Sequence, residues 1–443
     1  MKKILSLLLA LVMVFAVVLT FASCGESETS DDAELPTWYG WEGTKEVAKQ
    51  GSVNTTASEV SLTGDVSAVK IGLIMIGDET EGYTKAHMDG IKTAAKNLGI
   101  ADEQLVWKLV VPESDAVVTA GKQLIADGCT YIFSNSYGHQ AYMQTLAEEY
   151  PNVHFVAATG DTAAGLGYKN FSNCFTGVYQ CRYVSGVVAG LKLKELIDGG
   201  KLTDANKDGD NYKIGYVGAF NYAEVVSGYT AFYLGLKSIV PNVVMDVQYT
   251  SSWFDFDKEK AAAQLLIDRG CCIISQHADS AGAPTAVQEA LTNGKTVYSV
   301  GYNVSMLDAC PDGALTSATN NWFVYYQYAL ACAINGSDIA TNWAAGYEKE
   351  AVTTTELGKA CAAGTAEKVA EVVADIKSGK IKVFDTSKFT VGGKNVTWCY
   401  ATDTNADWTN DANNVISDGQ FLESYVQAAP AFALRIDGIT ELN

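Results

Sequence analysis

The sequence lacks the short motifs that are typical of common catalytic chemistry. It contains no G-x-S-x-G, no H-E-x-x-H and no phosphate-binding loop, and its four histidines lack the spacing of a metal site. Catalytic groups can also assemble from distant parts of a chain, so an extracellular hydrolase that uses acids such as Asp255 and Asp279 is one alternative. The missing motifs favour a binding protein that is not an enzyme and holds neither a cofactor nor a metal.

Basic residues are few. The chain has 31 Lys and Arg against 51 Asp and Glu, which gives a formal net charge of −20 at pH 7. Such a surface repels phosphate backbones, so we expect no nucleic-acid polymer as partner. Because hydrophobic residues make up 48% of the chain and charged residues only 19%, we expect folded domains rather than disorder.

Paired cysteine motifs are missing as well. The ten cysteines include no C-x-x-C, and several lie in apolar runs such as GCTYIFSNS and GCCIISQH. In such runs a cysteine behaves as a small hydrophobic residue. We therefore expect buried thiols rather than a disulfide framework, which a chain of this size does not need.

One apolar run stands at the start of the chain. Residues 4–22 are almost entirely apolar, follow Lys2 and Lys3, and end just before Cys24. This is the layout of a secretory signal, and LTFASCGE resembles the lipoprotein box, in which the cysteine becomes the lipidated N-terminus. A plain membrane-spanning anchor is the alternative. We expect residues 1–23 to be a lipoprotein signal peptide, Cys24 to carry lipid such as palmitate, and the remainder to lie on the extracytoplasmic face of the bacterial cell membrane.

After residue 23 no apolar run is long enough to span a bilayer. Residues 24–66 are rich in Ser, Thr, Glu and Asp, which predicts a flexible acidic spacer. The segment WYGWEG, residues 38–43, is more hydrophobic than a spacer requires.

From residue 67 onward, short apolar runs alternate with helical patterns. Strands are expected at 69–77, 105–111, 130–136 and 153–160, with helices between them. This alternation is typical of parallel sheets with right-handed crossovers. The same order then returns at an offset of 142 to 144 residues, through the pairs Lys70 and Lys213, Gly128 and Gly270, and Val153 and Val297. We therefore predict an α/β fold with two similar, doubly wound lobes.

Polar and aromatic residues follow the predicted strands. In doubly wound sheets, ligands bind outside the carboxyl ends of the strands, and two such edges that face each other form a cleft that a hinge can close. The edges read GDETEGY, SNSYGH and TGD in the first lobe and AFNYAE, SSWFD, QHADS and GYN in the second. Trp253 ends a strand beside Phe254, where it can stack on a flat ligand, although it can also simply cover the rim of the lobe.

Several segments between about residues 69 and 385 are similar to one known family. They include KIGLIMIGDETEGYTKAHMDGIKTA, VYQCRYVSGVVAGL, NYAEVVSGYTAFYLGLKSIVPN, SSWFDFDKEKAAAQLLIDRGCCIISQHADS, VYSVGYN and IKSGKIKVFD. They resemble the basic membrane protein (BMP) family of lipoproteins, which are substrate-binding components of ABC transporters. The resemblance implies the type I periplasmic binding protein fold, a purine nucleoside or purine base as ligand, and an ABC permease as partner. We expect the protein to be a monomer.

The resemblance and the strand edges together give the candidate ligand-binding residues: Glu79, Tyr83, His87, Asn135, Tyr137, Tyr179, Asn221, Trp253, Asp279 and Asn303. Many nucleoside-binding members carry Asp-Asp-x-x-Phe-Asn after the first strand, whereas this chain has DETEGYTKAH. That departure leaves open whether the ligand is a nucleoside or a free base. A sugar receptor of the same fold is a further alternative, because aromatic rings also stack on sugars.

The resemblance also implies boundaries. The two-lobed domain is expected at 67–385, with lobe one mainly at 67–178, lobe two mainly at 179–302, and a three-segment hinge. The crossovers are expected near 176–182, 301–303 and 317–322. Residues 386–443 form a C-terminal extension, in which FTVGGKNVTW predicts a hairpin.

Overall fold

The computed structural model describes residues 53–54, 61–401 and 411–443. The chain divides into two units, Met1–Thr37 and Trp38–Asn443, and every described residue belongs to the second. The predicted signal peptide, Cys24, the WYGWEG segment and most of the spacer lie outside the described residues.

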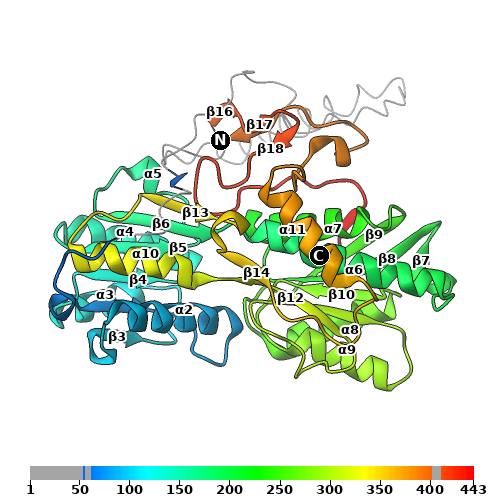
Figure 1. The fold of residues 1–443 in the computed structure, drawn as a ribbon, viewed down its shortest axis with the longest axis horizontal. Helices are drawn as coiled ribbons and strands as arrows, with labels where there is room; N and C mark the ends of the chain where they lie inside the picture. Colours follow the sequence, from blue (N-terminus) through cyan, green and yellow to red (C-terminus); the bar gives the residue numbers. More distant parts are fainter. Residues whose placement is uncertain (1–52, 55–60, 402–410) are drawn as a thin grey trace, which may run out of the picture. The chain divides into compact units, whose positions relative to one another are not determined.

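Two separate sheets organise the described chain (Figure 1). The first has the order β1-β13-β6-β5-β4-β2-β3, and all its strand pairs are parallel. Its strands are β1 (Val53–Asn54), β2 (Ile71–Ile74), β3 (Leu105–Lys108), β4 (Tyr131–Ser134), β5 (His154–Ala158), β6 (Phe171–Thr176) and β13 (Asn342–Ala345). We call the part built on this sheet lobe one.

The second sheet, in lobe two, has the order β14-β12-β11-β10-β8-β9-β19, and the short β7 pairs with β8 outside this path. Its strands are β7 (Lys207–Asp208), β8 (Asn211–Gly218), β9 (Val243–Tyr249), β10 (Ile273–Gln276), β11 (Tyr298–Tyr302), β12 (Ala314–Asn320), β14 (Val352–Thr354) and β19 (Ile439–Glu441). Only β14 and β7 run antiparallel to their neighbours. The predicted pair of doubly wound α/β lobes is confirmed.

Helices cover both faces of each sheet. Lobe one carries α2 (Gly82–Leu98), α3 (Ala116–Ala126), α4 (Gln140–Glu149), α5 (Ala163–Leu166) and α10 (Trp322–Asn335). Lobe two carries α6 (Val178–Asp198), α7 (Ala223–Lys237), α8 (Phe256–Asp268), α9 (Gly282–Thr292) and α11 (Thr365–Lys377). In lobe one, α2 packs on α10, and in lobe two, α6 packs on α7 and α8 on α9.

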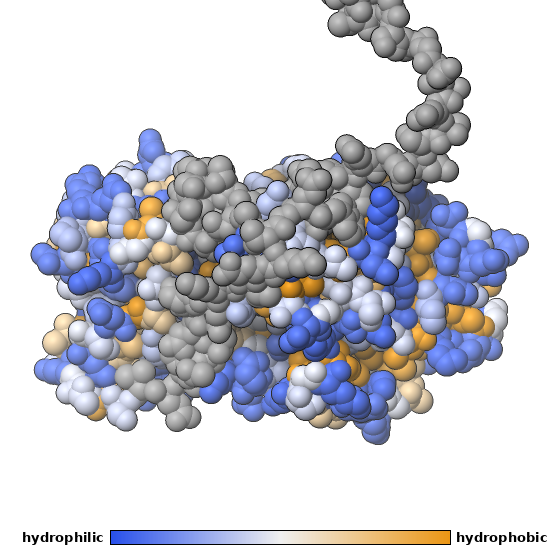
Figure 2. Space-filling model, turned by 90° about the horizontal axis from the view of Figure 1, so that it is seen from above, coloured by the Kyte–Doolittle hydropathy of each residue, from blue (hydrophilic) through white to orange (hydrophobic). Residues whose placement is uncertain are grey.

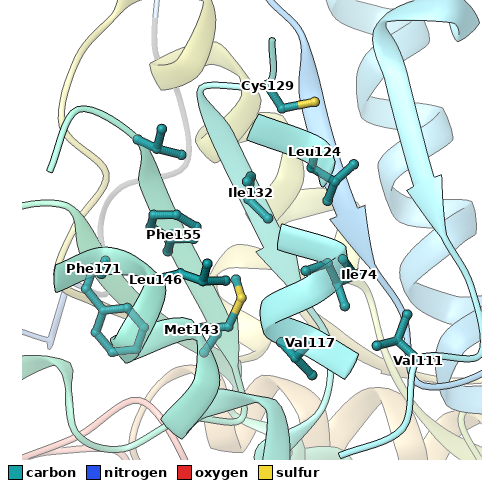
Figure 3. Close-up of a cluster of buried hydrophobic side chains, with 14 of the residues drawn as sticks. Ile74, Val111, Val117, Leu124, Cys129, Ile132, Met143, Leu146, Phe155 and Phe171 are labelled. Atoms are coloured by element: carbon teal, nitrogen blue, oxygen red, sulfur yellow. The ribbon is translucent and has the colours of Figure 1, made fainter. Parts of the chain in front are cut away.

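A compact apolar core joins α3 and α4 to the first sheet (Figure 3). Leu124 and Leu146 from the helices meet Ile74, Ile132 and Phe155 from the strands, and all five side chains are fully buried. Burial of each such side chain stabilises the fold by about 1.5–3 kcal/mol. The sheet therefore presents its carboxyl edge on a rigid base.

The internal repeat seen in the sequence has a structural cause. Gly128 and Gly270 follow the equivalent helices α3 and α8 with φ of 89° and 93°, a left-handed conformation that favours glycine. The Lys70 ammonium donates to the Asp127 carbonyl at 2.7 Å, and the Lys213 ammonium donates in the same way to the Arg269 carbonyl. Each lobe thus uses one lysine to satisfy the carbonyl that precedes its glycine.

Within the described residues, the chain crosses between the sheets three times, at residues 176–178, at 320–322 and at 346–351. The crossover expected near 301–303 is wrong, because Gly301 and Tyr302 belong to β11 and pair with Ser317 and Ala318 of β12 in the same sheet. The crossing at 346–351 joins β13 of lobe one to β14 of lobe two instead.

The C-terminal extension contacts both lobes. Ser227 of α7 donates to the Glu423 carboxylate at 2.9 Å, and Asn342 of β13 accepts from the Ala428 amide at 3.4 Å. In place of the hairpin expected in FTVGGKNVTW, the structure has a tight turn closed by one bridge between Val391 and Lys394. The short paired strands come later, as β15 (Tyr400–Ala401) with β16 (Asp411–Asn414) and β17 (Ile416–Ser417) with β18 (Gln420–Phe421).

Hydrophilic residues predominate around the margin of the face shown in Figure 2, with hydrophobic residues exposed between them in small groups. Within the described ranges, nine cysteines carry free thiols, and all but Cys361 are buried. No helix in those same ranges is both long and apolar enough to cross a membrane.

Candidate functional site

A cavity of about 470 Å³ lies between the carboxyl edges of the two sheets. Its walls come from the loops after β2, β3, β4 and β5 and the start of α2 in lobe one, and from the loops after β8, β9 and β10 and the end of β11 in lobe two. The lining residues are Ile76, Gly77, Asp78, Thr80, Glu81, Tyr83, Val110, Asn135, Ser136, Tyr137, Thr159, Phe220, Glu224, Ser251, Ser252, Trp253, Phe254, His277, Asp279 and Tyr302.

The two lobes touch at the N-terminus of α2. A Cβ atom placed on Gly82 would lie 3.1 Å from the carbonyl oxygen of Asp279 and 3.4 Å from the Val304 side chain. Backbone from lobe one and lobe two therefore approach too closely here for a larger side chain.

Glu81 begins α2 and also lines the cavity. Its carboxylate accepts from the backbone N–H groups of Tyr83 and Thr84, both at 2.8 Å, so it satisfies two donors that a helix start leaves unpaired. The negative charge also complements the helix dipole. Burial raises the pKa of Glu81 above its ordinary value, although the hydrogen bonds oppose this shift.

Asp279 faces Glu81 from lobe two. Its Oδ1 atom accepts from Asn303 at 2.6 Å, and Asn303 in turn accepts from Asn320 at 3.0 Å. Burial raises the pKa of Asp279 well above its usual range, and the nearby Glu81 and Glu259 carboxylates raise it further. Two carboxylates from opposite lobes thus line one cavity, where the charge of Glu81 favours the protonated form of Asp279.

Glu224 and His277 form the polar part of the lobe-two wall. Burial and the charge of Arg182 lower the pKa of His277 to about 4, so the ring is neutral. His277 Nε2 lies 3.2 Å from the Glu224 carboxylate, and Nδ1 lies 3.4 Å from the Tyr216 hydroxyl. We infer that Nε2 carries the proton and donates to Glu224, while Nδ1 accepts from Tyr216.

Arg182 lies behind this wall rather than in it. It is fully buried, its guanidinium carbon lies 3.6 Å from the centre of the Tyr302 ring, and one of its amino groups donates to the Gln276 carbonyl at 2.6 Å. The charge is held against the ring of Tyr302, a residue that lines the cavity. Among the described lining residues there is no lysine or arginine.

Aromatic rings gather on the lobe-two side. Trp253 packs against Phe220 with ring centres 5.1 Å apart and against Tyr222 at 6.1 Å. The backbone carbonyl of Trp253 accepts from the Asp279 amide at 2.9 Å, which fixes the loop after β9 against the end of β10. On the lobe-one side, Tyr83 also lines the cavity, and its hydroxyl is buried without a hydrogen-bond partner within the described chain.

Five of the candidate residues line the cavity: Tyr83, Asn135, Tyr137, Trp253 and Asp279. Asn303 lies behind them and orients Asp279. The Asn135 amide accepts from the Ile76 N–H at 2.9 Å and donates to the Thr84 hydroxyl at 3.0 Å. It therefore holds the loop after β2.

Four candidates lie elsewhere. Glu79 is exposed, and Glu81 two residues later faces the cavity in its place. His87 is fully buried behind the wall, where it stacks on Trp322 at 3.9 Å. The other two are occupied by the C-terminal part of the chain: the Tyr179 ring stacks on Phe384 at 5.5 Å, and Asn221 accepts from Arg435.

The sequence reasoning missed Glu81, Glu224, His277 and Phe220 as lining residues. All four stand in the strand-end segments GDETEGY, AFNYAE and QHADS, so the signal for them was their position after a strand. Within the described ranges, no group of three or more potential ligands is placed to hold a metal ion.

Comparison with known proteins gives consistent results. The family model of PnrA-like ABC transporter substrate-binding proteins matches residues 68–387. A purine-binding protein of Brucella abortus is 32% identical over 61% of this chain and 70% of its own length. A putative ABC transporter glucose-binding protein of Haloferax volcanii is 30% identical over 79% of this chain and 82% of its own length.

Among solved structures, a solute-binding protein of an ABC transporter system from Aeropyrum pernix has a TM-score of 0.59 at 16% identity, over 71% of this chain and 92% of that chain. A solute-binding protein from Conexibacter woesei has a TM-score of 0.53 at 19% identity, over 71% and 97%. At this identity the likeness concerns the fold, and it agrees with the type I periplasmic arrangement of two lobes.

Proposed function

Because the chain belongs to the family of PnrA-like ABC transporter substrate-binding proteins, we propose that it binds a purine nucleoside or purine base in the cavity between its lobes. It then delivers this ligand to an ABC permease. The observation that carries the proposal is a cavity walled by aromatic rings and by carboxylates, with no basic side chain among its described lining residues.

The polar lining favours a ligand that donates hydrogen bonds. Glu81, Glu224 and Asp279 offer carboxylate oxygens, which accept from the N–H groups of a purine or from ribose hydroxyls. A phosphate or carboxylate on the ligand would meet like charge in a poorly solvated space, which disfavours nucleotides. The volume of about 470 Å³ lies in the range of small-molecule sites.

The aromatic lining favours a flat ligand. Trp253 and Phe220 on lobe two face a space that Tyr83 bounds on lobe one. Stacking of a base on an aromatic ring contributes ~1–3 kcal/mol. The name of the Brucella relative supports a purine, whereas the name of the Haloferax relative supports a sugar. A sugar ligand is thus the second candidate.

The acids considered for hydrolysis do not form a pair in the cavity. Asp255 caps α8, where its carboxylate accepts from the Lys258 amide at 3.0 Å and pairs with the Lys258 ammonium at 3.2 Å. Asp279 lines the cavity, whereas Asp255 does not. We therefore propose a transport protein rather than an enzyme, and expect a bound nucleoside to be recovered intact after long incubation.

Titration calorimetry of the detergent-solubilised full chain tests the ligand. Adenosine, adenine, ribose, glucose and adenosine monophosphate are titrated in turn. We expect micromolar to nanomolar dissociation constants, about −8 to −12 kcal/mol, for adenosine or adenine. The monophosphate should bind at least tenfold more weakly. Tighter binding of glucose than of either purine would establish the sugar receptor instead.

The proposed location is the extracytoplasmic face of the cell membrane, with lipid on Cys24 as the anchor. In cells, Cys24→Ala should leave an uncleaved precursor that incorporates no labelled fatty acid. Lipid on the mutant would show that the N-terminal segment had been misread. The protein is proposed to act as a monomer, which light scattering of the solubilised chain measures.

A further inference from the structure

A second cavity, of about 390 Å³, lies in lobe two and shares no lining residue with the interlobe cavity. Helix α6, the C-terminal end of α7 and the segment after α11 form its walls, and α6 packs on both α7 and α11 (Figure 1). Its lining residues are Tyr183, Leu234, Lys237, Ser238, Pro241, Lys380, Ile381, Lys382, Val383, Asp385 and Lys388. We call it the lysine cavity.

The four lysines are mostly without acidic partners. Lys380 pairs with Asp375 at 2.8 Å, whereas Lys382 donates to the backbone carbonyl of Asp418 at 2.8 Å. Lys237 lies 5.4 Å from the centre of the Tyr233 ring. Within the described chain, neither Lys237, Lys382 nor Lys388 forms an ion pair with a carboxylate.

One acid lines the lysine cavity, and it is already engaged. The carboxylate of Asp385 accepts from the backbone N–H of Ser387 at 2.9 Å and from its hydroxyl at 2.7 Å. The cavity therefore has a local excess of positive charge on a chain of net charge −20. Charges beyond about 10 Å are screened at moderate salt, so the nearby lysines decide what binds here.

We propose that the lysine cavity binds a phosphate group carried on a small organic moiety, from either a soluble phosphate ester or the headgroup of an anionic lipid. Ammonium groups are point-charge donors that suit phosphate oxygens. Leu234, Ile381 and Val383 supply an apolar wall for the attached carbon chain, and the volume exceeds what a bare phosphate fills.

The lysines contribute unequally. Lys237 lies in the last turn of α7, where the helix dipole places partial negative charge that offsets the ammonium. Lys382 and Lys388 lie on the segment that follows α11, and Lys388 ends only a three-residue 3-10 helix, whose dipole is much weaker than that of the 15-residue α7. We therefore expect these two to dominate phosphate binding.

The soluble source is tested by titrating the detergent-solubilised full chain with glycerol 3-phosphate and with inorganic phosphate at low salt. Saturable binding of glycerol 3-phosphate should weaken about fivefold for each lysine lost in Lys382→Gln and Lys388→Gln, and should weaken further as salt is raised. As a matched control, Lys194→Gln with Lys295→Gln removes the same charge from two lobe-two ion pairs and should change nothing.

The lipid source is tested with the full chain reconstituted in phosphatidylcholine vesicles, with or without phosphatidylglycerol. Phosphatidylglycerol should slow amide exchange across residues 380–388. The variant that combines Lys382→Gln with Lys388→Gln should abolish that effect. If neither glycerol 3-phosphate nor phosphatidylglycerol gives a saturable effect that depends on Lys382 and Lys388, the proposal is overturned. Circular dichroism and the melting temperature check the fold of each variant, and purine affinity should stay unchanged, so this test is separate from that of the purine site.

Discussion

The two walls of the interlobe cavity differ in how their polar groups are used. On lobe one, the carboxylate of Glu81 caps α2, the amide of Asn135 holds the loop after β2, and the hydroxyl of Tyr137 donates to Asp161 at 3.2 Å. On lobe two, Glu224 receives one hydrogen bond at one oxygen, and Trp253 presents a partly exposed ring. Lobe one therefore offers a fixed wall, whereas lobe two offers groups with free capacity for a ligand.

This difference leads to a general expectation. Substitutions in the lobe-one wall should reduce stability, whereas substitutions in the lobe-two wall should reduce ligand affinity at nearly constant stability. The point at which the two lobes touch should affect affinity most, because both walls must meet before either can hold a ligand.

The largest effect is expected from Gly82→Leu. A side chain at this position would collide with the Asp279 carbonyl and Val304, and so would hold the lobes apart. Purine affinity measured by calorimetry should fall by at least about a hundredfold, since an unclosed cleft forfeits the contacts of one wall. The melting temperature without ligand should stay near that of the wild type.

Gly82→Ala is the graded control. Its Cβ would sit 3.1 Å from the carbonyl oxygen, a contact that a shift of a few tenths of an ångström relieves. A modest loss of affinity is therefore expected. Wild-type affinity in the leucine variant would show that the lobes need not approach at this point.

The next effect concerns stacking. Trp253→Ala should weaken purine binding by roughly fivefold to a hundredfold, because base–aromatic stacking is worth ~1–3 kcal/mol. Trp253→Phe should retain part of the affinity, since a smaller ring still stacks. The melting temperature without ligand should change little.

The lobe-one counterpart sharpens the comparison. Asn135→Ala removes a fully buried amide that bonds Ile76 and Thr84, and should lower the free energy of unfolding by about 1–3 kcal/mol. An alanine variant of Trp253 with lowered stability and unchanged purine affinity would instead assign that ring to the packing of the rim.

Glu224→Gln should reduce purine affinity by about tenfold, because a charged acceptor becomes a neutral one while the shape is kept. His277 can still donate to the new amide oxygen, so the melting temperature should remain close to that of the wild type. The effect should be larger for adenine than for glucose if Glu224 accepts from a base N–H. Equal losses for both ligands would indicate a general electrostatic effect.

The smallest effect is a pH dependence. The pKa values of Glu81 and Asp279 are raised where the lobes meet, so closure should take up protons on this pair. Because these pKa values are raised in the closed form, protonation stabilises that form at low pH. This stabilisation is lost as the pH rises through the raised pKa values. Affinity for adenosine should therefore fall, by roughly threefold, as the pH is raised through the range in which this pair loses its protons.

Calorimetry in buffers of different ionisation enthalpy should report proton uptake on binding, and Glu81→Gln should reduce it. Four further groups bear on the pair: Glu224 and His277 line the same cavity, Glu259 raises the pKa of Asp279, and Asp78 raises that of Glu81. Asp89→Asn is the matched control, since Asp89 is an exposed carboxylate on α2 that pairs with Lys85 at 2.6 Å and does not line the cavity. Uptake that is unchanged in Glu81→Gln would place the proton elsewhere.

Local signals in the sequence predicted much of the fold. Strand and helix periodicity located the alternating elements, and the repeat at Gly128 and Gly270 corresponds to two helix ends with the same left-handed backbone. The crossing at 346–351 had no comparable signal. Only the three-residue 3-10 helix Tyr347–Lys349 lies between its two strands, which is too short to show a helical periodicity in the sequence.

The sequence predicted which edge of each sheet forms the site, but not which side chains at that edge face the cavity. Position after a strand was enough to indicate Trp253 and Asp279. It could not separate Glu79 from Glu81, because the start of α2 decides which carboxylate turns inward. Nor could it show that Tyr179 is covered by Phe384, a contact made by a segment about two hundred residues away in the chain.

Photoaffinity labelling with 8-azidoadenosine, followed by mass spectrometry of the full chain, tests most directly whether the interlobe cavity is the purine site. We expect adducts on peptides from both walls, around residues 76–83 and 220–224 or 251–254, and protection by adenosine but not by glucose. Adducts confined to peptides outside these walls, or labelling that glucose suppresses as well as adenosine does, would contradict the account.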